Sequence, residues 1–204
     1  HHNLRINTDD SEISSKSNPN VFGLKATNND QIFNLPRKIH MTFPSLIVLQ
    51  IFNCSLMAIY NSAFEGLSNL EVIDLRHNNI ELFGNSAFND QKELKYLFLS
   101  HNKINFVEPN SFNNLRNLRF LHLDHNKLNE TNFGRFELRK LSELSHISFS
   151  HNNFKTFSTK LFNYNTKLER IELQCNQISI ISRFPRNLES NLKFIDLREN
   201  KCIN

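Results

Sequence analysis

One short phrase recurs six times along the chain and constrains its fold more than any other feature. It reads apolar residue, any residue, apolar residue, any two residues, Asn, any residue, and then an apolar residue or Cys. The asparagines of the six copies are Asn78, Asn102, Asn126, Asn152, Asn176 and Asn200. They lie 24 residues apart, except between Asn126 and Asn152, where the interval is 26. A fixed period of this length predicts a solenoid, in which each turn packs against its neighbours.

Within each copy, the spacing of the apolar residues predicts a short strand. Apolar and other residues alternate around Leu97 and Leu99, so one face of the strand points inward, and successive copies form a parallel sheet. The remaining residues of each repeat, about sixteen, are enough for the crossover that parallel strands need. The asparagine side chains are expected to form a structural ladder, because their amides can satisfy backbone groups that the turn after each strand leaves buried. Cys54 and Thr27 take the asparagine place in two earlier copies.

A second series of large residues follows the same period. It comes 13 residues after the second strand hydrophobe and consists of Phe64, Phe88, Phe112, Phe136 and Phe162. These rings are expected to stack on the convex side and fill the outer half of the core. The series places the two extra residues of the long repeat after Phe136. The charge of the segment Glu137 to Lys140 predicts that this insertion bulges into solvent.

These residues resemble the 24-residue leucine-rich repeat typical of extracellular animal proteins, LxxLxxLxLxxNxLxxLxxxxFxxLxx, over residues 21–204. The opening phrase, Leu35-Pro36 followed by Phe43-Pro44-Ser45-Leu46, is similar to that of secreted insect immune proteins of this class. The resemblance implies an α/β solenoid, a right-handed superhelix with a parallel concave sheet and loops or short helices on its convex side. It also implies an extracellular protein, either secreted or a receptor ectodomain, that captures a ligand on the concave face, acts in innate immunity and often forms a homodimer.

Two regions are expected. Residues 1–20 are a polar segment that includes a capping strand, anchored by Leu4, Ile6 and Ile13, and residues 21–204 hold about eight repeats. Extracellular members of the family usually end in a cysteine-bearing cap, which we expect to be absent or truncated here. Cys54, Cys175 and Cys202 are odd in number and widely spaced, which predicts neither a zinc site nor a dense disulfide framework. Cys175 precedes its ladder asparagine by one residue and Cys202 follows its own by two, so their sulfurs should not meet easily and we predict no internal disulfide.

The bulk composition narrows the class of partner. With 39% hydrophobic residues in 204, the chain can bury one continuous core. The net charge of +4 is spread over interleaved acidic and basic residues, so no basic stripe predicts a nucleic-acid partner. No apolar stretch is long enough to cross a membrane. Two sequons, at Asn53 and Asn129, are candidate N-glycosylation sites that favour secretion.

Side chains between the inward hydrophobes are expected to form rows on the concave face. A cluster of aromatic residues with a charged rim predicts a partner-binding surface for a protein ligand. Its residues are Asp74, Arg76, Tyr96, Phe98, Phe120, His122, Asp124 and Glu172. In a plainer interpretation Tyr96 and Phe120 simply cover the sheet, as apolar residues often do at exposed positions. A rival hypothesis is a structural or self-associating module that dimerises through an uncapped C-terminal end or the convex face.

Histidine and serine residues on the same side raise two chemical alternatives. His77, His101, His125 and His151 precede the ladder asparagine in four successive repeats, so they could hold a metal or charge together near pH 6. No carboxylate or thiolate is expected to complete a tetrahedral set, and we predict no metal and no cofactor. Ser100, Ser148, His122 and Asp124 share the concave face, but an open sheet excludes no water and offers no oxyanion site. The sequence therefore predicts a non-catalytic binding protein.

Overall fold

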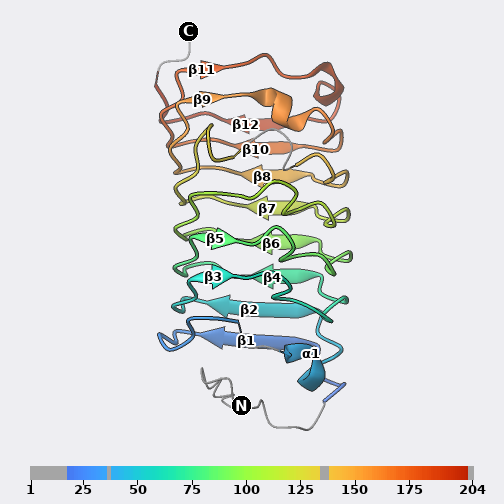
Figure 1. The fold of residues 1–204 in the computed structure, drawn as a ribbon. Helices are drawn as coiled ribbons and strands as arrows, with labels where there is room; N and C mark the ends of the chain where they lie inside the picture. The colour runs from blue at the N-terminus through green and yellow to red at the C-terminus, as the bar shows by residue number, and fades with distance from the viewer. Residues whose placement is uncertain (1–17, 36–37, 134–137, 202–204) are drawn as a thin grey trace.

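The repeats stack into a solenoid of about seven turns in the computed structural model, which describes residues 18–35, 38–133 and 138–201 (Figure 1). Eight parallel strands form one sheet in the order β1-β2-β4-β6-β7-β8-β10-β12. Their bounds are β1 Gly23–Thr27, β2 Val48–Phe52, β4 Val72–Asp74, β6 Tyr96–Phe98, β7 Phe120–His122, β8 His146–Ser148, β10 Arg170–Glu172 and β12 Phe194–Asp196. The predicted parallel sheet is confirmed. The capping strand expected within residues 1–20 falls almost wholly outside the described residues.

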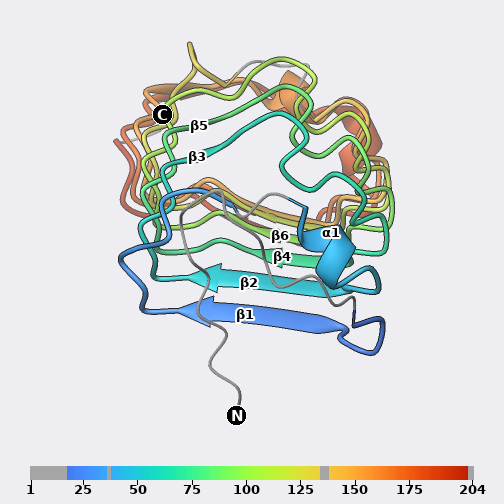
Figure 2. The ribbon, with the colours of Figure 1, turned by 60° about the horizontal axis from the view of Figure 1, so that its bottom comes forward.

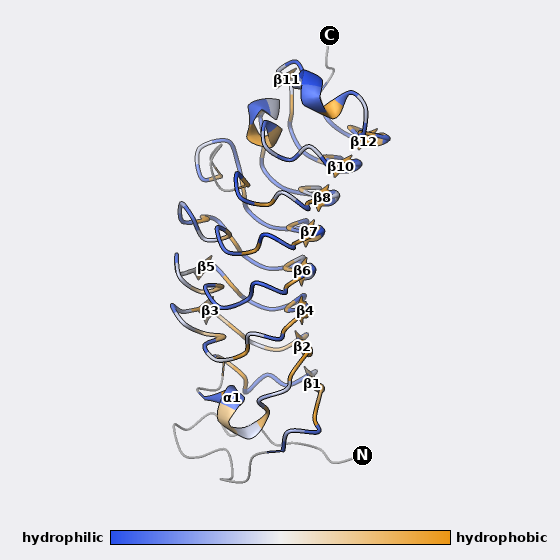
Figure 3. Ribbon diagram, turned by 90° about the vertical axis from the view of Figure 1, so that its right-hand side faces the viewer, coloured by the Kyte–Doolittle hydropathy of each residue, from blue (hydrophilic) through white to orange (hydrophobic). Residues whose placement is uncertain are grey.

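The sheet lines one side of the solenoid, and the crossovers close each turn on the other side (Figures 2 and 3). Adjacent strands are in register without any offset, so Leu97 lies beside Ile73 on one side and Leu121 on the other. All three of these side chains are fully buried. The 24-residue period therefore places the inward hydrophobe of each turn against that of the next.

The convex side consists of short elements joined by turns. Two-stranded sheets are formed there by β3 (Ala58–Ile59) with β5 (Leu82–Phe83), and by β9 (Thr156–Phe157) with β11 (Ile180–Ile181). Within the described residues, the helices are α1 (Ile39–Thr42) and the 3-10 helices η1 (Thr159–Phe162) and η2 (Arg186–Leu188). The prediction of loops and short helical turns outside the sheet is confirmed.

The ladder asparagines join neighbouring turns through their side-chain amides. Asn126 Nδ2 donates to the carbonyl oxygens of Leu99 and Leu123, both at 3.0 Å, and its Oδ1 accepts from the backbone N–H of Ile104 at 2.9 Å. The other ladder residues donate to equivalent pairs of carbonyls, and five of the six are at most 8% exposed. Each amide thus satisfies backbone groups of two turns that have no partner in the sheet.

The first repeat is shifted relative to the sequence-based prediction. Strand pairing sets Leu24 beside Leu49 and Thr27 beside Phe52, and Phe22 is 55% exposed. Thr27 is therefore not at the ladder place, which falls two residues later, at Asn29. The reason is that β1 follows the pairing with β2, whereas the apolar residues of this degenerate copy suggested a different register.

The convex phenylalanine series holds at four of its five places. Phe64, Phe88, Phe112 and Phe162 are at most 1% exposed, and the ring centroids of Phe64 and Phe88 lie 5.3 Å apart. The fifth member, Phe136, lies outside the described residues.

Leu138 takes the fifth place in that series. It is fully buried, and its carbonyl oxygen accepts from Asn165 Nδ2 at 2.9 Å, in the same way as Phe64 accepts from Gln91 Nε2 at 2.8 Å. The prediction that the segment 137–140 bulges into solvent is therefore wrong at Leu138, because a fully buried leucine anchors this segment in the core.

The two extra residues lie earlier in the long repeat. The second buried hydrophobic residue after the ladder asparagine comes five residues later in two repeats, at Val107 and at Phe157. In the long repeat it comes seven residues later, at Phe133. The insertion therefore falls between Leu128 and Phe133, in a polar segment that begins with the second sequon.

Candidate functional site

Aromatic rings from three adjacent strands meet on the concave face. The Tyr96 and Phe120 rings stack with centroids 5.0 Å apart, and the Phe120 and His146 rings stack at 4.4 Å. Phe98 lies 6.3 Å from Tyr96 and 5.2 Å from His122. All five side chains are half-buried. We call these five residues the concave aromatic cluster; the sequence placed four of them in the candidate site and left out His146.

Arg76 forms one edge of the cluster. Its guanidinium lies 5.1 Å from the Phe98 ring centroid and 5.6 Å from that of Phe52. Asp74 accepts from Arg76 Nε at 2.9 Å and from Nη2 at 2.7 Å, and Asp74 is only 3% exposed. Asp74 was expected to contact a partner, but its carboxylate is covered and orients Arg76 instead. Glu172 likewise binds Arg170 Nε, at 2.6 Å.

Asp124 links the cluster to the preceding turn. Its Oδ1 accepts from Ser100 Oγ at 2.7 Å and lies 3.7 Å from His122 Nδ1. Burial lowers the pKa of His122, although the carboxylate of Asp124 opposes the shift. Ser100 donates its hydrogen bond to Asp124, and Ser148 is hydrogen-bonded to Ser150. In the described contacts, neither serine is therefore hydrogen-bonded to His122, the base that a serine nucleophile would need.

The histidine column lies at the sharp turn that follows each strand. His77, His101, His125 and His151 have φ between 52° and 56°, a left-handed conformation in which Asn, Asp and His are enriched among non-glycine residues. Their rings stack with centroids 4.2, 3.9 and 3.9 Å apart. The Asp124 carboxylate lies beside this column, and one ligand atom each of His101, Asp124 and His125 lie within 4.8 Å of one another. The sequence predicted the column but no carboxylate with it, whereas the structure places Asp124 beside His101 and His125.

Acid is expected to destabilise the fold through these histidines. Burial, followed by the charges of His101 and His151, lowers the pKa of His125 below its ordinary 6.5, and Asp124 only partly opposes the shift. The pKa values of His101, His122 and His146 are lowered too, with burial as the largest cause. The unfolded chain then binds protons more readily, so this stability is present above pH 6.5 and is lost as the pH falls below it.

Thermal unfolding at pH 7.5 and pH 5.5 measures this effect. The melting temperature should fall at pH 5.5, and His125→Gln should reduce the fall, because it removes one of the groups that resist protonation in the folded chain. Equal melting temperatures at both pH values would contradict the prediction.

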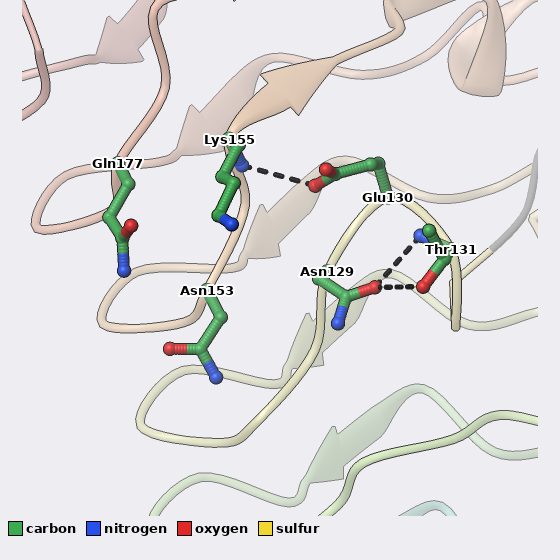
Figure 4. A pocket seen from close by; sticks show the side chains of 6 residues that line it. All are labelled: Asn129, Glu130, Thr131, Asn153, Lys155 and Gln177. Carbon is green, nitrogen blue, oxygen red and sulfur yellow. Dashed lines mark hydrogen bonds between the residues drawn. The ribbon is translucent and has the colours of Figure 1, made fainter.

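A hollow on the outer side next to β9 is lined by polar residues (Figure 4). They are Asn129, Glu130, Thr131, Asn153, Lys155 and Gln177. Asn129 Oδ1 accepts from both the backbone N–H of Thr131, at 2.8 Å, and Thr131 Oγ1, at 2.6 Å. The amide nitrogen of Asn129 points away from Thr131 (Figure 4). The other sequon differs, because Asn53 Nδ2 is bonded to Asn28 Oδ1 at 2.8 Å.

Among the described residues, Cys54 and Cys175 carry free thiols, and Cys202 lies outside them.

The fold and the stacked repeats define the chain as a leucine-rich-repeat solenoid, the fold typical of protein-binding receptor ectodomains. Two family models, both described as leucine-rich repeat, match residues 83–128 and 69–90. No curated protein matches the chain in sequence. No helix in the described part of the chain is long and apolar enough to span a bilayer.

Three of the solved structures that share this fold illustrate the similarity. TLR13 in the TLR13–ssRNA13 complex is 27% identical with a TM-score of 0.81, over 88% of this chain and 25% of that one. A leucine-rich-repeat protein of Leptospira interrogans is 23% identical with a TM-score of 0.71, over 82% and 41%. A chain of the octameric complex of Latrophilin 3, Unc5D and the FLRT2 leucine-rich repeats is 21% identical with a TM-score of 0.73, over 89% and 62%. The chain spans less than two thirds of each.

Proposed function

We propose that the chain is a non-catalytic binding module that recognises a protein partner on its concave sheet. The observation that supports this proposal is the concave aromatic cluster, whose rings stack across β6, β7 and β8 into one continuous patch. A contiguous aromatic patch on a mostly polar surface marks interaction sites more often than scattered apolar residues do. Tyr, Phe and Arg are also the residue types enriched where protein interfaces bury their core.

Arg76 adds a preformed anchor beside the rings. Asp74 holds its guanidinium through two hydrogen bonds, and the ring of Phe98 supports it from one side. The Arg76 side chain therefore has little conformational freedom left to lose when a partner binds. An arginine fixed in this way costs less entropy on binding than a freely moving one, and arginines are frequent energetic hot spots.

Single-stranded RNA is the second candidate ligand, because the structure of TLR13 contains ssRNA13. Aromatic residues that bind single strands usually offer their ring faces to the bases. Here the ring of Phe120 is stacked on both sides, by Tyr96 and by His146, so its edges are left for contact. The carboxylate of Asp124 next to the cluster would also repel phosphates. Both features favour a protein over RNA.

The proposed setting is extracellular, as a secreted protein or a receptor ectodomain, with innate immunity suggested by the resemblance to insect immune proteins. The sequon at Asn129 supports it. A glycan there would lie on the outer side, near β9, and would leave the concave cluster free. Self-association is the alternative; exposed apolar side chains outside the concave cluster favour it, among them Leu82 and Phe106 on the convex side and Phe194 in the edge strand β12.

The test is affinity capture from extracellular fluid of the source organism on the immobilised chain, followed by mass spectrometry. Phe98→Ala and Phe120→Ala should each weaken capture of a specific protein at least about tenfold, as truncation of a central hot spot does. Phe106→Ala is the matched control, because this ring is 44% exposed but lies on the convex side. Capture through the concave face is expected to survive that change.

Two other outcomes would contradict the proposal. Capture that is unaffected by both concave substitutions but lost with Phe106→Ala would move the binding surface to the convex side. Binding of a single-stranded RNA oligonucleotide that survives physiological salt and depends on Phe120 would favour the RNA alternative. Light scattering on the same samples would show whether the chain forms a dimer instead.

A further inference from the structure

We propose that His101, Asp124 and His125 form a binding site for a divalent transition metal ion, with Zn²⁺ as the expected occupant. The three residues come from the turns that follow β6 and β7, and one ligand atom of each lies within 4.8 Å of the others. Two imidazoles and a carboxylate are a ligand set that zinc commonly takes in proteins. The proposal goes beyond partner recognition and stands or falls independently of it. We call these residues the His-Asp-His site.

The backbone holds the three residues in place. The N–H of His101 donates to the carbonyl oxygen of Asp124 at 3.0 Å, which fixes the two turns against each other. His125 follows Asp124 directly, and its own N–H donates to Ser150 in the next turn at 2.9 Å. Ligand atoms around a tetrahedral zinc ion lie roughly 3.3 Å apart, given metal–ligand distances near 2 Å. The ligand atoms, all within 4.8 Å of one another, would therefore have to come slightly closer together to bind the ion.

Stacking of the imidazoles aligns two of the ligands. The rings of His101 and His125 are nearly parallel, with an interplanar angle of 13° and centroids 3.9 Å apart. One ring nitrogen of each lies within 4.8 Å of the other and of an Asp124 oxygen. His101 is exposed and the other two residues are half-buried, so the site is open to water, which can complete the coordination. The two imidazoles disfavour Ca²⁺ and Mg²⁺, which prefer oxygen ligands only.

The charges around the site suit a cation. Asp124 supplies a negative charge, and Ser100 Oγ donates to Asp124 Oδ1, which helps to hold the carboxylate in place as partners of metal ligands typically do. Arg76 acts electrostatically on His101, as His77 and His151 do, but the Arg76 guanidinium is already engaged by Asp74. The repulsion that Arg76 would exert on a metal ion is therefore largely offset.

Isothermal titration of the whole chain with Zn²⁺ tests the site. Every sample carries His1→Ala and His2→Ala, because two adjacent terminal imidazoles can bind zinc by themselves. We expect one Zn²⁺ per chain, at least tenfold weaker binding in Asp124→Asn and in His125→Ala, and no heat with Mg²⁺. His151→Ala is the matched control, since this ring stacks on His125 at 3.9 Å but is not one of the three ligands, and its affinity should stay within about twofold.

Circular dichroism melts in EDTA verify that each variant is folded, so that lost binding reports the site itself. Three outcomes would overturn the proposal. The first is no zinc binding by the parent chain. The second is full zinc affinity in Asp124→Asn together with weaker zinc binding in His151→Ala. That result would assign the ion to the stacked imidazoles alone. The third is binding of Mg²⁺ as tightly as Zn²⁺. X-ray absorption at the zinc edge should show two imidazole ligands.

Discussion

Replacing Asn126 with alanine is expected to lower the free energy of unfolding by about 3 kcal/mol or more. Its amide donates to the carbonyls of Leu99 and Leu123 and accepts from the N–H of Ile104, and the side chain is 8% exposed. Each such bond contributes about 1 kcal/mol net, and each buried backbone group left unpaired costs about 1–3 kcal/mol. Because these bonds join two turns, the loss weakens the packing on which a repeat protein depends.

Urea unfolding followed by circular dichroism measures the effect, with two control variants. Asn117→Ala removes an exposed amide that donates to the carbonyl of Lys92, and should cost less than about 1 kcal/mol. Asn126→Cys should fall in between, because Cys54 already stands at a ladder place with its Sγ 3.5 Å from the carbonyl oxygen of Phe52. An Asn126→Ala variant no less stable than Asn117→Ala would show that the ladder does not stabilise the fold.

Replacing Phe88 with alanine is expected to cost a similar amount, about 3–5 kcal/mol. Phe88 is 1% exposed and lies between two other rings, with centroids 5.3 Å from Phe64 and 6.2 Å from Phe112. Truncation removes its buried surface and leaves a cavity in a region where rings of neighbouring turns pack on each other. The same denaturant experiment gives the magnitude.

Phe88→Leu is the matched variant for this site. The chain itself uses leucine at the equivalent place of another turn, where Leu138 is fully buried. The leucine variant should therefore lose only about 1 kcal/mol, since it keeps an apolar side chain of similar volume. If both variants were equally destabilised, the ring would be required for more than filling space, and the expected cavity effect would be wrong.

The repeat phrase was sufficient to predict most of the fold. Leu97 and Leu99 indicated a strand with an inward face, and Asn102 after them indicated the turn, because each signal lies within eight residues of sequence. Two structural amides were missed. Gln91 and Asn165 are at most 1% exposed and bridge convex turns, but no constant residue type marks their place in the other repeats.

The candidate site was predictable only in part. Rows of concave side chains follow directly from the strand period, so the repeat spacing alone was enough to place Tyr96 beside Phe120. The contact between Asp74 and Arg76 could not be predicted, because the repeat pattern places both residues on the concave face. The pattern does not say which of the two side chains covers the other. The omission of His146 has the same cause: the repeat spacing showed its row but not the stacking of its ring on Phe120.

The sequence by itself determined the period, the inward residues and the ladder, because these depend on a pattern that each repeat carries locally. Only the tertiary structure decided where the two extra residues lie, because it places both Phe133 and Leu138 in the core. It also brought Asp124 to His101, 23 residues earlier in the chain. Contacts between turns depend on side-chain rotamers and on the shape of the stack, which a one-dimensional pattern does not contain.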